Sequence, residues 1–114
     1  MITSVLSLPI RFGCESETVQ FYLERDVFRL AAQVGGFRSG KLLQPSETGA
    51  PFLVIAEWDD ADAYGRWLAA PARAELSVLL QPLLAGEPSG DTYELVVSET
   101  DPASGPDQQQ EATS

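Results

Sequence analysis

The chain has no histidine, and Cys14 is the only cysteine among its 114 residues. Without histidine, the Ser-His and Cys-His arrangements of nucleophilic catalysis are excluded, because their general base is missing. A single thiol cannot form an intramolecular disulfide, and it makes neither a zinc site nor a redox pair. The cysteine content therefore favours a reducing, cytoplasmic location.

Basic residues are also scarce, with seven Lys and Arg against 17 Asp and Glu, and the formal net charge is -10. A charge of this sign repels phosphate backbones and anionic lipid surfaces, so we expect neither nucleic acid nor a membrane as a partner. No apolar run approaches the length of about 18 residues that a membrane-spanning helix needs, and the first residues lack the pattern of a secretory leader. Glycine-rich phosphate-binding motifs are absent, which removes the usual cradle of a nucleotide cofactor.

The length and the 44% hydrophobic content fit one compact domain, which we place at residues 1–99. From residue 100 to residue 114 the sequence is rich in Pro, Gln, Ser and acidic residues. Such a segment cannot bury enough apolar area to offset the cost of ordering it. We therefore predict a disordered acidic tail over 100–114.

Hydrophobic periodicity predicts four strands and three helices within this domain. The most regular segment runs from Glu15 to Val34, where apolar residues follow the spacing of one helical face until Gly35 and Gly36 end it. Asp59 or Asp60 is suited to cap the next helix. The predicted elements are a strand from Ile2 to Phe12, a helix from Glu15 to Val34, strands over 37–44 and 52–58, helices beginning near Asp60 and at Pro71, and a strand from Thr92 to Glu99.

The order β-α-β-β-α-α-β predicts an α+β, ferredoxin-like fold, in which a four-stranded antiparallel sheet carries helices on one face. The other face of the sheet then needs a cover. The strands over 52–58 and 92–99 are apolar on both sides, so we expect this face to meet a second copy of the chain across a two-fold axis. A homodimer follows as a prediction.

Aromatic residues gather around the end of the strand over 52–58 and the helix that follows it. Trp58, Tyr64 and Trp67 combine apolar rings with polar tips, and Arg73 adds a fixed cation nearby. The acidic residues of this region stand at a helix start, where the helix dipole alone stabilises them, so we expect no metal. These residue types predict a pocket for a flat organic anion, although each aromatic residue is also typical of a hydrophobic core.

Four short motifs resemble the antibiotic biosynthesis monooxygenase family. They are the strand end Glu57-Trp58, the acidic step Asp59-Asp60, the helix end Trp67-Leu68 with the Ala70-Pro71 turn, and the step Gly35-Gly36-Phe37 between the first helix and the second strand. Members of that family are small dimeric α/β barrels with the arrangement of elements predicted above. The resemblance covers roughly residues 1–99.

The family includes cofactor-independent oxygenases of aromatic polyketides, quinol oxygenases and haem-degrading enzymes. The haem-degrading members use an Asn, a Trp and a His, and this chain contains neither Asn nor His. Many other members carry His where this chain has Trp67 and Arg73. The polyketide oxygenases are similar in pairing a strand-end Trp with a Tyr six residues later, as Trp58 and Tyr64 do here. An Asn on the same strand is replaced by Val54.

The resemblance thus implies a cofactor-free monooxygenase of secondary metabolism that acts with O2 on an aromatic polyketide of the anthrone or quinol type. Trp58, Tyr64 and Arg73 would stabilise the anion of the substrate, while Phe21 and Phe28, with Trp67 and Val54, would line its site. No general base is identified. Two alternatives stay open: a polyketide cyclase or isomerase on the same scaffold, and a non-catalytic dimer that binds a hydrophobic ligand.

Overall fold

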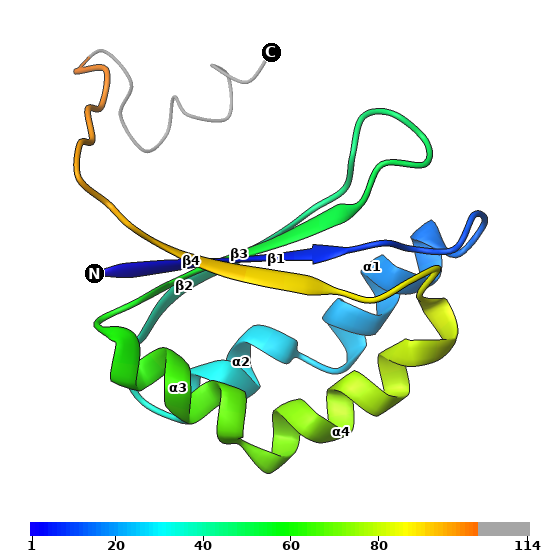
Figure 1. Cartoon of the computed structure of the whole chain (residues 1–114), viewed down its shortest axis with the longest axis horizontal. Coiled ribbons are helices and arrows are strands. Elements are labelled where there is room, and N and C mark those ends of the chain that lie inside the picture. The colour runs from blue at the N-terminus through cyan, green and yellow to red at the C-terminus, as the bar shows by residue number, and fades with distance from the viewer. Residues whose placement is uncertain (103–114) are drawn as a thin grey trace.

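Four strands and four α-helices form two layers in the computed structural model, which describes residues 1–102 of the chain. The strands make one sheet, and the helices all lie on one side of it (Figure 1). A 3-10 helix, Gln81–Leu83, follows the last α-helix. The elements are β1 (Ile2–Leu8), α1 (Glu15–Glu24), α2 (Val27–Ala32), β2 (Phe37–Leu43), β3 (Phe52–Trp58), α3 (Ala61–Ala69), α4 (Pro71–Leu80) and β4 (Ser89–Glu94).

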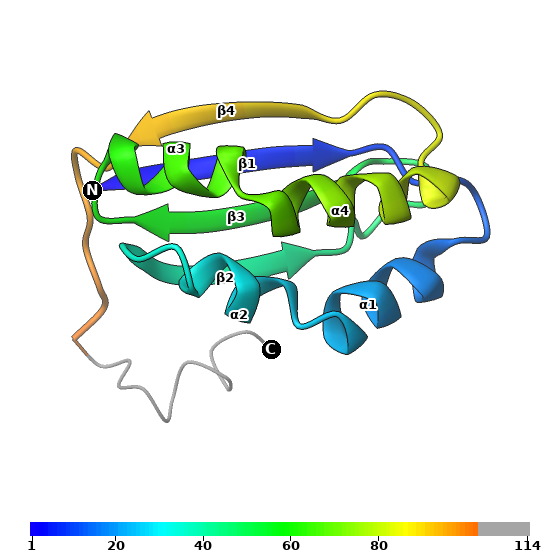
Figure 2. The ribbon, with the colours of Figure 1, turned by 90° about the horizontal axis from the view of Figure 1, so that it is seen from below.

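The sheet has the strand order β2-β3-β1-β4, and every neighbouring pair of strands is antiparallel. Strands β1 and β3 are therefore central, while β2 and β4 form the edges. Seen from the helix side, α2 lies in front of β2, and α3 and α4 cross the middle of the sheet (Figure 2). This arrangement confirms the predicted α+β, ferredoxin-like fold.

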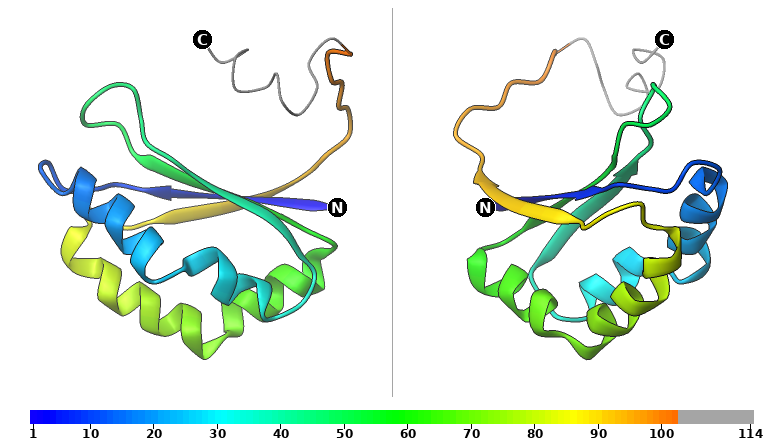
Figure 3. Two further views of the ribbon diagram at one scale, coloured as in Figure 1. Left: turned by 180° about the vertical axis from the view of Figure 1, so that it is seen from behind. Right: turned by 45° about the vertical axis from the view of Figure 1, so that its right-hand side comes forward.

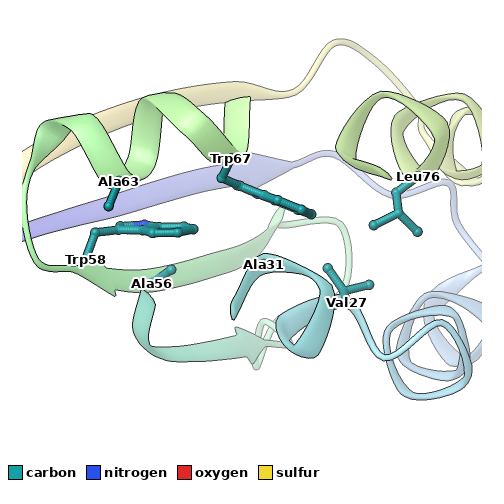
Figure 4. Close-up of a cluster of buried hydrophobic side chains, with 7 residues drawn as sticks. All are labelled: Val27, Ala31, Ala56, Trp58, Ala63, Trp67 and Leu76. Atoms are coloured by element: carbon teal, nitrogen blue, oxygen red, sulfur yellow. The ribbon is translucent and has the colours of Figure 1, made fainter. Parts of the chain in front are cut away.

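The core fills the space between the sheet and the helices. Alternate residues of a strand point to opposite faces, and Leu8, Phe52 and Trp58 on the helix-facing side are each only 1% exposed. Trp58 lies between Ala56 of β3 and Ala63 of α3 (Figure 4). The buried core residues are Leu8, Val27, Ala31, Phe52, Ala56, Trp58, Ala63, Trp67, Leu76 and Leu80.

The other face of the sheet carries no helix (Figure 3). The strand register places Val5 of β1 and Ile55 of β3 opposite each other on this face, because Ser4 and Ala56 beside them are buried against the helices. Leu43 and Tyr93, at the two edges, share this face and are 41% and 56% exposed. We call this surface the bare face.

The single helix predicted over Glu15–Val34 is wrong, because the chain breaks it into α1 and α2. The break occurs at Asp26, which adopts a left-handed conformation with φ of 53°. Asp tolerates this region better than most residues, and its carboxylate pairs with Arg29 at 3.4 Å. The turn redirects the chain so that Tyr22 before it and Val27 after it both face the core. The apolar periodicity therefore continues across the break and hides it.

The predicted bounds of the first and last strands also need correction. Strand β1 ends at Leu8 because Pro9 has no N–H for the ladder, and Phe12 is 87% exposed. Strand β4 begins three residues before the predicted Thr92 and ends at Glu94, which pairs with Ile2, the first residue of β1. It is consequently a polar strand, exposed throughout, and not the apolar strand that we expected.

Residues 95–102 form no helix or strand. The predicted acidic tail extends beyond them and lies, from residue 103 onward, outside the described residues. In residues 1–102, none of the helices has the length and hydropathy needed to cross a membrane.

Gly40 of β2 allows the ring of Phe28 to lie directly on the strand, since a Cβ atom at this position would overlap that ring. We expect Gly40→Ala to lower the free energy of unfolding by about 1–3 kcal/mol, the usual cost of overpacking a filled site. Urea denaturation measures this change. The matched control is Gly65→Ala in α3, where a Cβ meets nothing within 4 Å. The control should be neutral or stabilising, and equal stabilities for the two variants would contradict the packing argument.

Candidate functional site

An apolar cavity of about 90 Å³ lies between the helix-facing side of the sheet and the helices. Because one water needs roughly 10–15 Å³ of such space, the cavity has room for several waters. We call it the aromatic pocket. The structure brings to it all seven residues that the sequence analysis selected, namely Phe21, Phe28, Val54, Trp58, Tyr64, Trp67 and Arg73.

Aromatic rings form most of one continuous wall of this pocket. Six rings follow one another from α1 to α3, and each centroid lies 5.3 to 6.2 Å from the next. Edge, tilted and stacked contacts alternate along the series, and these are the favourable geometries for aromatic pairs. An aromatic wall of this kind suits an aromatic ligand. Its members in order are Phe21, Tyr22, Phe28, Phe37, Trp58 and Tyr64.

Trp58 uses its indole N–H inside the protein. Nε1 donates a hydrogen bond to Oγ of Ser4 at 3.0 Å, and both residues are buried. Since Nε1 is the only donor of the indole, Trp58 has no free donor for a ligand while this bond is kept. The bond occupies a lone pair of the Ser4 hydroxyl, whose own proton can be donated into the pocket that Ser4 lines. Of this pair, the hydroxyl group of Ser4 and not the indole of Trp58 is therefore the donor available to a ligand.

Arg73 of α4 carries the only formal charge among the residues that line the pocket. Its side chain is half-buried. The ion pairs found in residues 1–102 involve Arg29 and Arg38, so no described carboxylate lies within 4 Å of the Arg73 guanidinium. An aromatic pocket with one uncompensated cation favours a negatively charged ligand.

Tyr22 and Tyr64 add two phenol groups to the pocket lining. Burial raises the pKa of Tyr22 from 10.0 to about 12, although the nearby positive charge of Arg73 acts in the opposite direction. Tyr22 thus stays protonated at neutral pH and is a hydrogen-bond donor there. The ring of Tyr64, in α3, has its centroid 5.5 Å from that of Trp58 at the end of β3.

Further residues line the pocket that were not predicted from the sequence, and those with polar or aromatic side chains are Ser4, Tyr22, Phe37 and Ser77. A polar Ser4 between Ile2 and Leu6 on the buried side of a strand was a usable signal. Tyr22 belongs to the apolar stripe of the first predicted helix. Its spacing therefore predicts a buried ring and gives no sign that the phenol hydroxyl lines a pocket. Nothing in the sequence distinguishes Ser77 from other polar helix residues.

Metal binding finds no support in the donor set of the pocket. The lining residues include neither a cysteine nor a carboxylate, and residues 1–102 contain no cluster of three potential metal-ligating side chains. Cys14 lies at the start of α1 and does not line the pocket.

Solved structures with the same fold include several oxygenases. The chain is 24% identical to a mutant of SnoaB, a cofactor-independent oxygenase from Streptomyces nogalater, with a TM-score of 0.68 over 89% of this chain and 96% of that one. It is 16% identical to an antibiotic biosynthesis monooxygenase, with a TM-score of 0.71 over 85% and 100% of the two chains. A third structure, a mutant of MhuD with two manganese protoporphyrin IX molecules per active site, is 18% identical, with a TM-score of 0.72 over 89% and 100%.

These identities are low, and the likeness establishes the shared fold alone. Among curated protein sequences, none matches the chain. The family model of the antibiotic biosynthesis monooxygenases, in contrast, matches residues 1–76, from β1 into α4. This match covers more than half of the 114 residues. The chain belongs to the antibiotic biosynthesis monooxygenase family.

Proposed function

We propose that the protein is a cofactor-independent monooxygenase that oxidises a planar aromatic anion, of the anthrone or quinol type of polyketide, with O2. The observation that carries this proposal is the half-buried, uncompensated Arg73 in an otherwise uncharged aromatic pocket. A partly desolvated cation is costly until it meets an anion, so the free energy of pairing favours the ionised form of a substrate.

The reaction balances with O2 as the only oxidant. The anion of an anthrone gives one electron to O2, and the resulting carbon radical and superoxide combine into a peroxide at that carbon. Loss of water then leaves a carbonyl group. One oxygen atom enters the product, and the other leaves as water with the two hydrogens of the original methylene carbon.

Five polar side chains of the pocket have a role in this scheme. Arg73 pairs with the negative charge of the substrate, and Ser4, held by Trp58, donates to an enolate oxygen. Tyr64 and the protonated Tyr22 supply further donors. Fixed donors of this kind stabilise charge without reorganising during the reaction. The apolar residues Phe21, Phe28, Val54 and Trp67 orient the ring system and exclude water.

A general base is absent from the lining of the pocket, since the lining contains no carboxylate and the chain no histidine. Tyr22 cannot take this part at neutral pH because its pKa is about 12. The substrate must therefore arrive already ionised, or lose its proton to water. Aromatic compounds whose anions form readily, such as hydroxyanthrones, meet this requirement.

The description of SnoaB as a cofactor-independent oxygenase is consistent with the proposal. Porphyrin chemistry of the kind suggested by the MhuD complex is disfavoured here, because the His and Asn of the haem-degrading pattern are both missing. A place in cytoplasmic secondary metabolism follows from the same assignment.

The proposal is tested by O2 uptake with a hydroxyanthrone as the substrate. We expect stoichiometric O2 consumption and quinone formation by the unaltered protein. Arg73→Gln should lower kcat/KM by about 10- to 100-fold, since a charge-assisted contact to the substrate is worth about 1.5–3 kcal/mol. The matched control is Arg29→Gln, which removes the same charge from an exposed pair on α2 and should leave the rate unchanged.

Three results, from this assay or from a parallel one with an open-chain polyketide, would count against the assignment. Ring closure of a polyketide without O2 uptake would identify a cyclase or isomerase, and binding without turnover would identify a ligand-binding protein. Full turnover by a Trp58→Phe variant would remove Trp58 and its bond to Ser4 from the mechanism.

The absence of a base predicts how the rate depends on pH. We expect kcat/KM to rise with pH and to level off above the pKa of the substrate, because the anion is the reactive form and no group in the pocket collects its proton. Two hydroxyanthrones whose pKa values differ by about one unit should give profiles displaced by about the same amount. Profiles with one common midpoint for both substrates would reveal an enzyme base.

We further propose that the bare face of the sheet is covered by a second copy of the chain. Apolar side chains at the centre of this face, with Leu43 and Tyr93 at its edges, would otherwise remain in contact with water. We expect a dimer mass in sedimentation equilibrium and a shift toward monomer for Ile55→Lys. A monomer mass for the unaltered protein at micromolar concentration would contradict the proposal.

A further inference from the structure

A second hollow adjoins the aromatic pocket on the side of the edge strand β4. Its volume is about 540 Å³, and it is lined by Leu6, Tyr64, Leu68, Arg73, Pro88, Gly90, Asp91 and Thr92. We call it the outer groove. Three of these residues, Leu6, Tyr64 and Arg73, also line the aromatic pocket. The two spaces are therefore neighbours that share a boundary of three side chains.

Gly90 lies beside the boundary between the two spaces and adds no side chain to it. The register pairs Gly90 with Leu6, and a Cβ atom at Gly90 would lie 3.7 Å from Cδ1 of Leu6 and 3.8 Å from the hydroxyl oxygen of Tyr64. These are ordinary contact distances, so a methyl group would fit without strain. A longer side chain at this position would instead project into the outer groove, which Gly90 lines.

The outer groove differs from the aromatic pocket in chemistry. The register pairs Thr92 with Ser4, which puts the Thr92 hydroxyl on the helix-facing side of β4, and Tyr64 supplies a second hydroxyl. All six residues of β4 are exposed, so the groove is open to water, and its lining mixes these polar groups with Leu6, Leu68 and Pro88. The register pairs Asp91 with Val5 and so turns its carboxylate toward the bare face, but the net charge of -10 on the chain opposes a second anionic group in the groove.

We infer that the outer groove is a second subsite, which binds an uncharged polar extension of a substrate whose planar part occupies the aromatic pocket. Arg73, common to both spaces, meets the anionic oxygen at the junction, and Thr92 and Tyr64 exchange hydrogen bonds with the extension. This inference rests on the proposed binding of an aromatic anion. The substrate is thus elongated, with an apolar head, a negative charge at its middle and hydroxyl or carbonyl groups beyond it. The groove lies on the helix side of the sheet, away from the bare face.

Binding of two probes that are already oxidised, and so consume no O2, tests this inference without turnover. The compact probe is 2-hydroxy-1,4-naphthoquinone, an anion at neutral pH, and the extended probe is the same ring system bearing a hydroxyalkyl chain. By calorimetry, the unaltered protein should bind the extended probe about tenfold more tightly, the effect of one or two additional hydrogen bonds. Gly90→Leu should abolish this gain and leave the affinity for the compact probe unchanged within about twofold.

The matched control is Gly86→Leu, which adds the same side chain outside the groove, where a Cβ meets only Pro9 at 3.7 Å. It should retain the tenfold preference. Equal affinity of the unaltered protein for both probes would overturn the inference, as would an undiminished preference in Gly90→Leu or an equal loss for both probes. Binding of the compact probe without O2 uptake in the anthrone assay would instead refute the proposed oxygenase and leave the subsite standing.

Discussion

The hydrogen bond between Trp58 and Ser4 joins the two central strands on the buried side of the sheet, and the site depends on it. Trp58 is the last residue of β3, and Asp60 caps α3 by accepting a hydrogen bond from the N–H of Ala63 at 2.9 Å. Asp60 thus fixes where α3 begins, and the buried indole of Trp58 packs against Ala63 in the first turn of that helix. A ring free to turn about its side-chain bonds would leave both the wall of the pocket and the first turn of α3 without a fixed support.

Charge distribution separates the pocket from the rest of the molecule. The chain carries a net charge of -10, while the lining of the pocket holds one cation and no anion. Long-range repulsion would slow the approach of anionic ligands in general. Under the proposed function, selectivity would combine this repulsion with a short-range contact to Arg73, so that shape and charge would both be required.

Local sequence patterns were sufficient for the fold and for the neighbours Trp58 and Tyr64, because a strand that runs directly into a helix fixes their relation. They were insufficient wherever a contact depends on strand register. Ser4 and Trp58 are 54 positions apart, and only the pairing of β1 with β3 brings them together. The end of β4 is set in the same way by its partner β1. The sequence does not reveal the turn at Asp26, because the apolar residues before and after it follow one continuous helical spacing.

Strand β4 is an edge of the sheet, and its composition lowers the risk of aggregation that edge strands carry. A long apolar edge strand offers its free main-chain groups to any other chain and promotes aggregation. β4 is short, contains Gly90, and carries Asp91 and Glu94. The glycine and polar residues that leave the outer groove open thus also discourage another chain from adding a strand to this edge. Substitutions that place apolar side chains in the groove are therefore expected to lower solubility.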